Sequence, residues 1–185
     1  MSCGIVSIFG GSSPRPGSPA YEEAYTLGRL LAQAGYTVAT GGYTGVMEAA
    51  SRGAAEAGGH VIGVTTDALN LWEARAQQPN PWVKEEIKFP TLRDRLFHLV
   101  NSCDAMIALR GGIGTLSEVS LAWSLLQVGE ITPRPLILLG NDWQEWLTRY
   151  YGRGEYIRPE HMALWQCVAT PQEALAALNG YSRQP

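Results

Sequence analysis

The chain has 185 residues, with 17 acidic and 14 basic side chains and a formal net charge of −3 at pH 7. Its length suits one domain with a full core, and its 45% hydrophobic and 17% charged fractions are ordinary for a soluble globular protein. The acidic balance argues against a nucleic-acid binder that works through a broad basic face. We therefore expect one domain over residues 1–185, without a nucleic-acid partner.

The cysteines and the apolar runs restrict the class of protein further. Cys3, Cys103 and Cys167 lie far apart and are odd in number, and no CxxC or histidine-rich spacing accompanies them. No stretch reaches the roughly 20 apolar residues that a membrane helix needs. The N-terminus lacks the basic region and long apolar run of a signal peptide. We expect a cytoplasmic protein without a metal site, disulfides or membrane contact.

Short apolar runs alternate with helical patterns along the chain. Ser18 followed by Pro19 is typical of a helix start, and Gly35 of a helix end. Residues 67–81 lack a regular pattern and are expected to form a flap. Strands are expected at 5–9, 36–39, 60–65, 83–89, 105–109, 135–139 and near Cys167, and helices at 19–34, 45–57, 91–103, 116–128, 142–151 and 171–178.

This alternation predicts an α/β fold, a Rossmann-like three-layer arrangement with a parallel sheet of six or seven strands and helices on both faces. Three of the expected strands end in double glycines, at Gly10-Gly11, Gly41-Gly42 and Gly111-Gly112. Ligands of such sheets bind beyond the carboxyl ends of the strands. We therefore expect the three glycine pairs to meet at one edge and to form the binding site.

The most informative motif is the loop Gly111-Gly112-Ile113-Gly114-Thr115, between an expected strand and an expected helix. Glycines there expose backbone N–H groups at the positive end of a helix dipole, which suits a phosphate. In the alternative interpretation, the turn needs glycine only for its backbone dihedral angles. No lysine follows the glycines, so the loop is not a Walker loop, and the first strand is not followed by a dinucleotide fingerprint.

Three charged side chains near this loop have two interpretations each. Glu118 stands three residues after Thr115 and can cap its helix, or it can stabilise positive charge at an anomeric carbon or activate water. Arg95 can be a solvated residue or reach the site. Arg93, two positions away, points to a different side of the helix. Arg110 either adds charge to the phosphate site or points away from it.

Together these motifs resemble the Lonely guy (LOG) family, often labelled lysine decarboxylase-like, over about residues 5–139. The resemblance rests on the residues at 9–13, on the glycine loop at 40–48, and on 111–118, which matches the family signature GGxGTxxE. It implies a nucleotide-binding Rossmann-like domain that needs no cofactor and forms a homodimer. The implied reaction hydrolyses the N-glycosidic bond of a nucleoside 5′-monophosphate, such as a cytokinin riboside 5′-monophosphate or AMP, to free base and ribose 5-phosphate.

The resemblance also implies roles for individual residues. Arg95 and Glu118 fall at the positions of the family's catalytic pair. The implied phosphate-binding residues are Gly111, Gly112, Ile113, Gly114 and Thr115. The other implied ligand contacts are Gly11, Ser12, Gly41, Gly42, Glu73 and Ser124.

The sequence departs from the family pattern at several positions. Arg110 replaces a proline before the double glycine, and Tyr43 replaces the third glycine of the second loop. Tyr43 has two interpretations, as a core residue or as a ring that flanks a flat base. The residues at 45–50 and 114–118 are more similar to those of a related group that includes a molybdenum-cofactor carrier. This similarity implies the alternative function, non-catalytic binding of a phosphorylated cofactor.

The lysine decarboxylase label can be tested on the residues themselves. Pyridoxal-phosphate chemistry needs a lysine for its Schiff base. Lys84 and Lys88 are the chain's two lysines, and both lie on one expected strand, remote in sequence from every glycine loop. We therefore exclude a pyridoxal-phosphate-dependent lysine decarboxylase.

Overall fold

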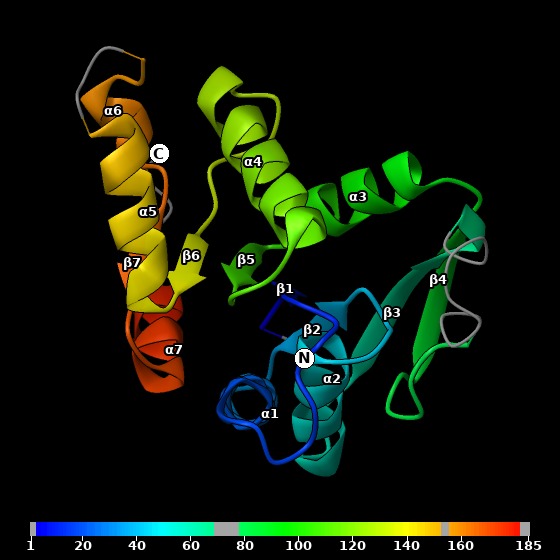
Figure 1. Cartoon of the computed structure of the whole chain (residues 1–185). Coiled ribbons are helices and arrows are strands. Elements are labelled where there is room, and N and C mark those ends of the chain that lie inside the picture. Colours follow the sequence, from blue (N-terminus) through cyan, green and yellow to red (C-terminus); the bar gives the residue numbers. More distant parts are fainter. Residues whose placement is uncertain (1–2, 69–77, 153–155, 182–185) are drawn as a thin grey trace.

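The computed structural model describes residues 3–68, 78–152 and 156–181. Within these residues, seven strands form one parallel sheet in the order β4-β3-β2-β1-β5-β6-β7 (Figure 1). The strands are β1 (Ile5–Phe9), β2 (Thr37–Thr40), β3 (Val61–Thr66), β4 (Glu85–Phe89), β5 (Ala105–Ala108), β6 (Leu136–Leu139) and β7 (Gln166–Val168). The helices are α1 (Pro19–Gln33), α2 (Val46–Glu56), α3 (Leu92–Asn101), α4 (Ile113–Val128), α5 (Asn141–Tyr151), α6 (Pro159–Met162) and α7 (Pro171–Gly180).

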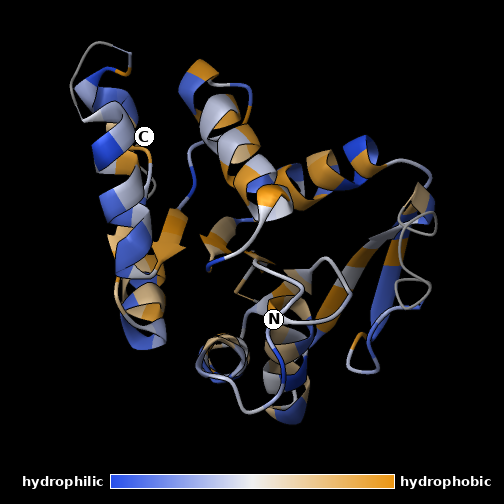
Figure 2. Ribbon diagram, viewed as in Figure 1, coloured by the Kyte–Doolittle hydropathy of each residue, from blue (hydrophilic) through white to orange (hydrophobic). Residues whose placement is uncertain are grey.

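The helices cover both faces of the sheet, which confirms the predicted three-layer α/β fold. Residues of α1, α2 and α7 form one hydrophobic core with the strand side chains on their side of the sheet. Residues of α3, α4 and α5 form a second core on the opposite side. Figure 2 shows the apolar residues concentrated on the strands and on the helix faces turned toward them. Burial of these faces is the main stabilising contribution to the fold.

The order of the strands places a switch point beside β1. From β1 the chain adds β2, β3 and β4 on one side, and it then crosses back to add β5, β6 and β7 on the other. Phe9 at the end of β1 pairs in register with Ala108 at the end of β5. Ligands of open α/β sheets bind in the crevice at such a reversal. The double glycines after β1 and β5 lie at this point.

Two details of the helices differ from the sequence-based expectations. Helix α4 begins at Ile113 rather than at residue 116, since Gly112 is its N-cap and the loop's last residues form its first turn. The short helix α6 was not expected. Residues 69–77 of the expected flap, including Glu73, lie outside the described residues. None of the helices in the described ranges combines the length and apolar character that a membrane span requires.

Candidate functional site

The structure brings the three glycine loops into direct contact, as the sequence predicts. The Gly11 N–H donates to the Arg110 carbonyl across 3.0 Å, and the Val46 N–H donates to the Gly11 carbonyl across 2.9 Å. The Thr44 hydroxyl donates to the Ser12 carbonyl at 3.1 Å. The loops after β1, β2 and β5 therefore form one backbone surface at the carboxyl edge of the sheet.

The close approach of these loops requires glycine at particular positions. A Cβ atom on Gly111 would overlap the Thr115 side chain and come within 2.8 Å of the Gly11 nitrogen. Gly45 has φ +72°, and a Cβ there would lie 2.5 Å from the Ser12 carbonyl carbon. Packing alone thus explains part of the glycine pattern, whether or not the loops bind an anion.

The start of α4 offers unpaired backbone donors. Its N-cap, Gly112, has no side chain to accept a hydrogen bond. Within the described part of the chain, no acceptor is present for the N–H groups of Ile113, Gly114 and Thr115. The first helical bond at this end joins the Leu116 N–H to the Gly112 carbonyl. Since these N–H groups stand at the positive end of a 16-residue helix, the loop has the chemistry of a phosphate site.

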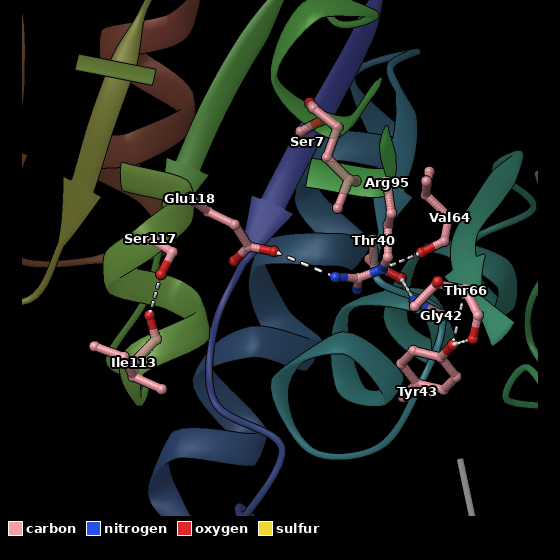
Figure 3. A network of polar contacts seen from close by, with 11 residues as sticks. Ser7, Thr40, Gly42, Tyr43, Val64, Thr66, Arg95, Ile113, Ser117 and Glu118 are labelled. Carbon is pink, nitrogen blue, oxygen red and sulfur yellow. Dashed lines mark hydrogen bonds and ion pairs between the residues drawn. The ribbon is translucent and has the colours of Figure 1, made fainter. Parts of the chain in front are cut away.

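Glu118 does not cap its helix, so the capping interpretation is wrong. The N-cap is Gly112, and Glu118 stands six residues later, in the second turn of α4. The helix begins three residues earlier than the T-x-x-E spacing suggested, which moves Glu118 away from the free N–H groups. Its side chain is buried, with 7% of its surface exposed, and it points toward Arg95 (Figure 3).

Arg95 comes from α3 and is held by contacts on several sides. Its Nε donates to the Val64 carbonyl at 2.7 Å, and its guanidinium carbon lies 5.7 Å from the centre of the Tyr43 ring. Its Nη1 lies 3.9 Å from Glu118 Oε1. Arg95 is 6% exposed whereas Arg93 is exposed, which confirms that the two arginines lie on different sides of the helix.

Tyr43 is buried, and its ring packs against the Arg95 guanidinium. Its hydroxyl donates to the Thr66 carbonyl at 3.1 Å and accepts from the Thr66 N–H at 2.9 Å. The Asn80 side chain donates to the Tyr43 carbonyl at 3.0 Å. Tyr43 is therefore a buried support for Arg95 rather than a ring exposed to a base. Sequence reasoning missed Asn80, because a lone Asn-Pro pair in an irregular stretch is typical of an exposed turn.

Burial changes the ionisation of the Arg95–Glu118 pair. It raises the pKa of Glu118 to about 7, and the nearby Arg95 charge offsets only part of this effect. Burial likewise lowers the pKa of Arg95, against the opposing effect of Glu118. At 3.9 Å the two charges are too far apart for a close hydrogen-bonded pair. The site thus holds a carboxyl group that changes protonation near neutral pH, a property suited to acid–base chemistry.

Gly41 leaves the space that Arg95 occupies, and this leads to a first prediction. A Cβ atom on Gly41 would overlap Arg95 Nη2 and lie 2.5 Å from the Met47 sulfur. Gly41→Ala is expected to displace the guanidinium and to lower the free energy of unfolding by about 1–3 kcal/mol, measured by urea denaturation. Gly180→Ala is the matched control, since nothing lies within 4 Å of its added Cβ. Equal effects of the two substitutions would contradict this account of Gly41.

The sequence analysis also considered Arg110, Ser124 and Glu73 for the site, and Glu73 lies outside the described residues. Arg110 points toward α5, where its Nη1 lies 2.9 Å from the Asp142 carboxylate. Ser124 is exposed on α4, and its contact with a ligand stays a prediction, as does that of Glu73. In the ranges that the structure describes, no cluster of three or more His, Cys, Asp or Glu side chains could hold a metal ion.

The fold and the glycine loops define a Rossmann-like α/β protein with a parallel sheet, and sequence comparison identifies the family. The chain belongs to the SLOG cluster4 family, whose model matches residues 4–145. A 102-residue segment is 34% identical to a protein of Archaeoglobus fulgidus and covers 55% of this chain and 63% of that protein. The family match confirms the LOG-like resemblance drawn from the motifs.

Relatives with stated activities align over most of the chain. It is 30% identical over 184 residues to the probable cytokinin riboside 5′-monophosphate phosphoribohydrolase LOGL6 of Oryza sativa subsp. japonica, covering 96% of this chain and 71% of that protein. It is 27% identical over 179 residues to the cytokinin riboside 5′-monophosphate phosphoribohydrolase of Mycobacterium tuberculosis, covering 93% and 91%. The molybdenum cofactor binding protein of Rippkaea orientalis has a similar structure, with a TM-score of 0.73, 28% identity and coverage of 95% and 94%.

Proposed function

We propose that this protein hydrolyses the N-glycosidic bond of a nucleoside 5′-monophosphate and releases the free base and ribose 5-phosphate. The observation that carries the proposal is the buried Glu118 carboxyl, held opposite Arg95. Its backbone lies three to five residues along α4 from the free N–H groups, a helix rise of roughly 4.5–7.5 Å. This separation is comparable to the span of a ribose 5-phosphate. The similarity to the plant and mycobacterial phosphoribohydrolases supports the same assignment.

The proposed mechanism gives each part of the site one task. The N–H groups of Ile113, Gly114 and Thr115 hold the 5′-phosphate, and the ribose extends toward Glu118. As the C1′–N bond breaks, its electron pair leaves with the base, and the Glu118 carboxylate stabilises the positive charge that develops at C1′. A water oxygen bonds to C1′ and gives its proton to Glu118, and the base gains a proton from solvent. Arg95 orients the ligand and keeps Glu118 more acidic than burial alone would allow.

The mechanism predicts a pH dependence with a definite sign. It requires the Glu118 carboxylate, and the pKa of this group is about 7. The value of kcat/KM for base release should therefore fall about tenfold per pH unit below pH 7 and stay level from about pH 8. The 5′-phosphate also titrates, near pH 6. The contribution of the phosphate to the pH dependence of kcat/KM is obtained separately, by measuring how nucleotide binding to Glu118→Gln changes with pH. A rate that falls as the pH rises through 7 would show that the protonated acid is the active form.

The proposed function is tested by chromatography of the products formed from a panel of nucleoside 5′-monophosphates. AMP should yield free adenine. Adenosine and 3′-AMP cannot place a phosphate at the start of α4 and should react at least about 100-fold more slowly. The reason is that binding interactions remote from the reacting bond support the chemical step. Equal rates for AMP and adenosine would exclude the assigned phosphate site. No release from any member of the panel would exclude the hydrolase.

A second candidate function is non-catalytic carriage of a phosphorylated cofactor. The observation that favours it is the similarity in sequence and structure to the molybdenum cofactor binding protein of Rippkaea orientalis. This function predicts tight ligand binding without turnover, and binding that survives Glu118→Gln.

A further inference from the structure

A cavity lies beside the glycine loop, between the start of α4 and α5. Its volume is about 300 Å³, at the lower end of the range for small-molecule sites. Ile113, Leu116, Trp143 and Trp146 supply its apolar walls, and Arg110 and Asp142 line it with charged groups. We call this space the α5 cavity.

The α5 cavity and the Glu118 carboxyl lie on opposite faces of α4. Leu116, which lines the cavity, is two residues from Glu118, a rotation of about 200° around a helix axis. Glu118 instead points toward Arg95, which comes from α3 (Figure 3), and α3 and α5 lie on different sides of α4 (Figure 1). Gly111 and Gly112, the first two residues of the phosphate loop, line the cavity. A ligand phosphate at the start of α4 would therefore have a site on each side of it.

The side chains of the α5 cavity suit a flat ring joined to an anion. Trp146 is 43% exposed although it lines the cavity, and its indole stacks on Tyr150 with ring centres 6.2 Å apart and an angle of 18°. An exposed, oriented indole beside a cavity is a surface on which an aromatic ring can stack. The exposed Arg110 guanidinium lies between this surface and the phosphate loop, and its Nη1 is 2.9 Å from the Asp142 carboxylate. An anion bound by Arg110 would share the guanidinium with Asp142.

We propose that the α5 cavity binds the second nucleoside of a pyrophosphate-linked dinucleotide. This inference rests on the proposed function and extends its substrate from a nucleoside 5′-monophosphate to a dinucleotide that contains one. One phosphate lies at the start of α4 with its ribose toward Glu118, and the other lies by Arg110 with its base on Trp146. Hydrolysis then breaks one C1′–N bond, adds water to C1′, and leaves the pyrophosphate intact. The products are one free base and a nucleoside diphosphate ribose.

The test compares the affinities of AMP, ADP and diadenosine 5′,5′-pyrophosphate by calorimetry. ADP supplies the second phosphate without the second ring. All proteins in this comparison carry Glu118→Gln, so that the ligands are bound without being cleaved. This background should bind the dinucleotide at least about tenfold more tightly than ADP, given the usual strength of base–aromatic stacking. Trp146→Ala should remove this advantage and change the affinities for AMP and ADP less than twofold. Tyr156→Ala, which removes an 82% exposed aromatic residue that does not line the cavity, is the control.

Arg110→Gln provides a second, exposed substitution that does not depend on the packing of Trp146. This substitution should lower the affinities for ADP and for the dinucleotide by a similar factor and leave the affinity for AMP unchanged. The inference is overturned if the dinucleotide binds no better than ADP, or if Trp146→Ala weakens all three ligands equally. If AMP is cleaved in that case, the proposed function stands without the α5 cavity. If none of the three nucleotides binds, both proposals fail.

Discussion

Glu118→Gln is expected to lower kcat for base release about 1000-fold and to change nucleotide affinity less than about threefold. The amide keeps the shape of the carboxyl group, but it can neither stabilise the charge at C1′ nor accept a proton from water. Because Glu118 points toward Arg95 and not toward the start of α4, the phosphate donors should remain unchanged. The rate is measured by chromatography of the released base, and the affinity by calorimetry.

Glu130→Gln is the matched control for this substitution. Glu130 is exposed and follows the end of α4, so its substitution removes one negative charge without affecting the site. Its rate should equal that of the wild type. A loss of less than tenfold in Glu118→Gln would contradict the catalytic role of the carboxylate. Unchanged tight binding by both proteins, with no turnover in either, would favour the carrier function.

The same substitution is expected to stabilise the protein at alkaline pH. The pKa of Glu118 is about 7 in the folded chain against 4.5 for the unperturbed group, because its burial is unfavourable to the charged form. Between these two pKa values the folded state therefore binds more protons than the unfolded state. As a result, the contribution of Glu118 to the free energy of unfolding falls as the pH rises through about 7. Relative to wild type, the free energy of unfolding of Glu118→Gln should rise by about 3 kcal/mol between pH 4.5 and 8.

This second prediction is measured by urea denaturation of both proteins across the pH range. The quantity of interest is how the free energy of unfolding of Glu118→Gln, minus that of wild type, changes with pH. Any constant offset between Glu and Gln cancels in this comparison. Glu130→Gln again controls for the loss of one charge. A difference that does not vary between pH 4.5 and 8 would show that Glu118 ionises normally, and the proposed pH dependence of activity would lose its basis.

The order of elements and the edge that carries the site could be predicted from the sequence. Apolar runs of four to six residues separated by helical patterns allow few arrangements other than a parallel sheet. The double glycines at strand ends then identify the edge. The pattern could not locate the start of α4, since Gly114 weakens the helical signal and Gly112, which caps the helix, is also a common turn residue.

The interactions inside the site depended on tertiary structure. Whether Arg95 is solvated or buried is decided by Tyr43, Gly41 and the Val64 carbonyl, which come from β3 and the loop after β2. Nothing local to Arg95 in the sequence indicates these contacts. Similarly, the α5 cavity joins Trp146 to a loop more than 30 residues earlier in the sequence. The homodimer, the cytoplasmic location and the single domain stay predictions.

The most direct test of the central claim is to quantify free adenine and ribose 5-phosphate together after incubation with AMP, for wild type and Glu118→Gln side by side. We predict that wild type forms the two products in equal amounts and that Glu118→Gln forms neither at a comparable rate. Wild-type protein that binds AMP but forms neither product, or Glu118→Gln that forms both at the wild-type rate, would contradict the account.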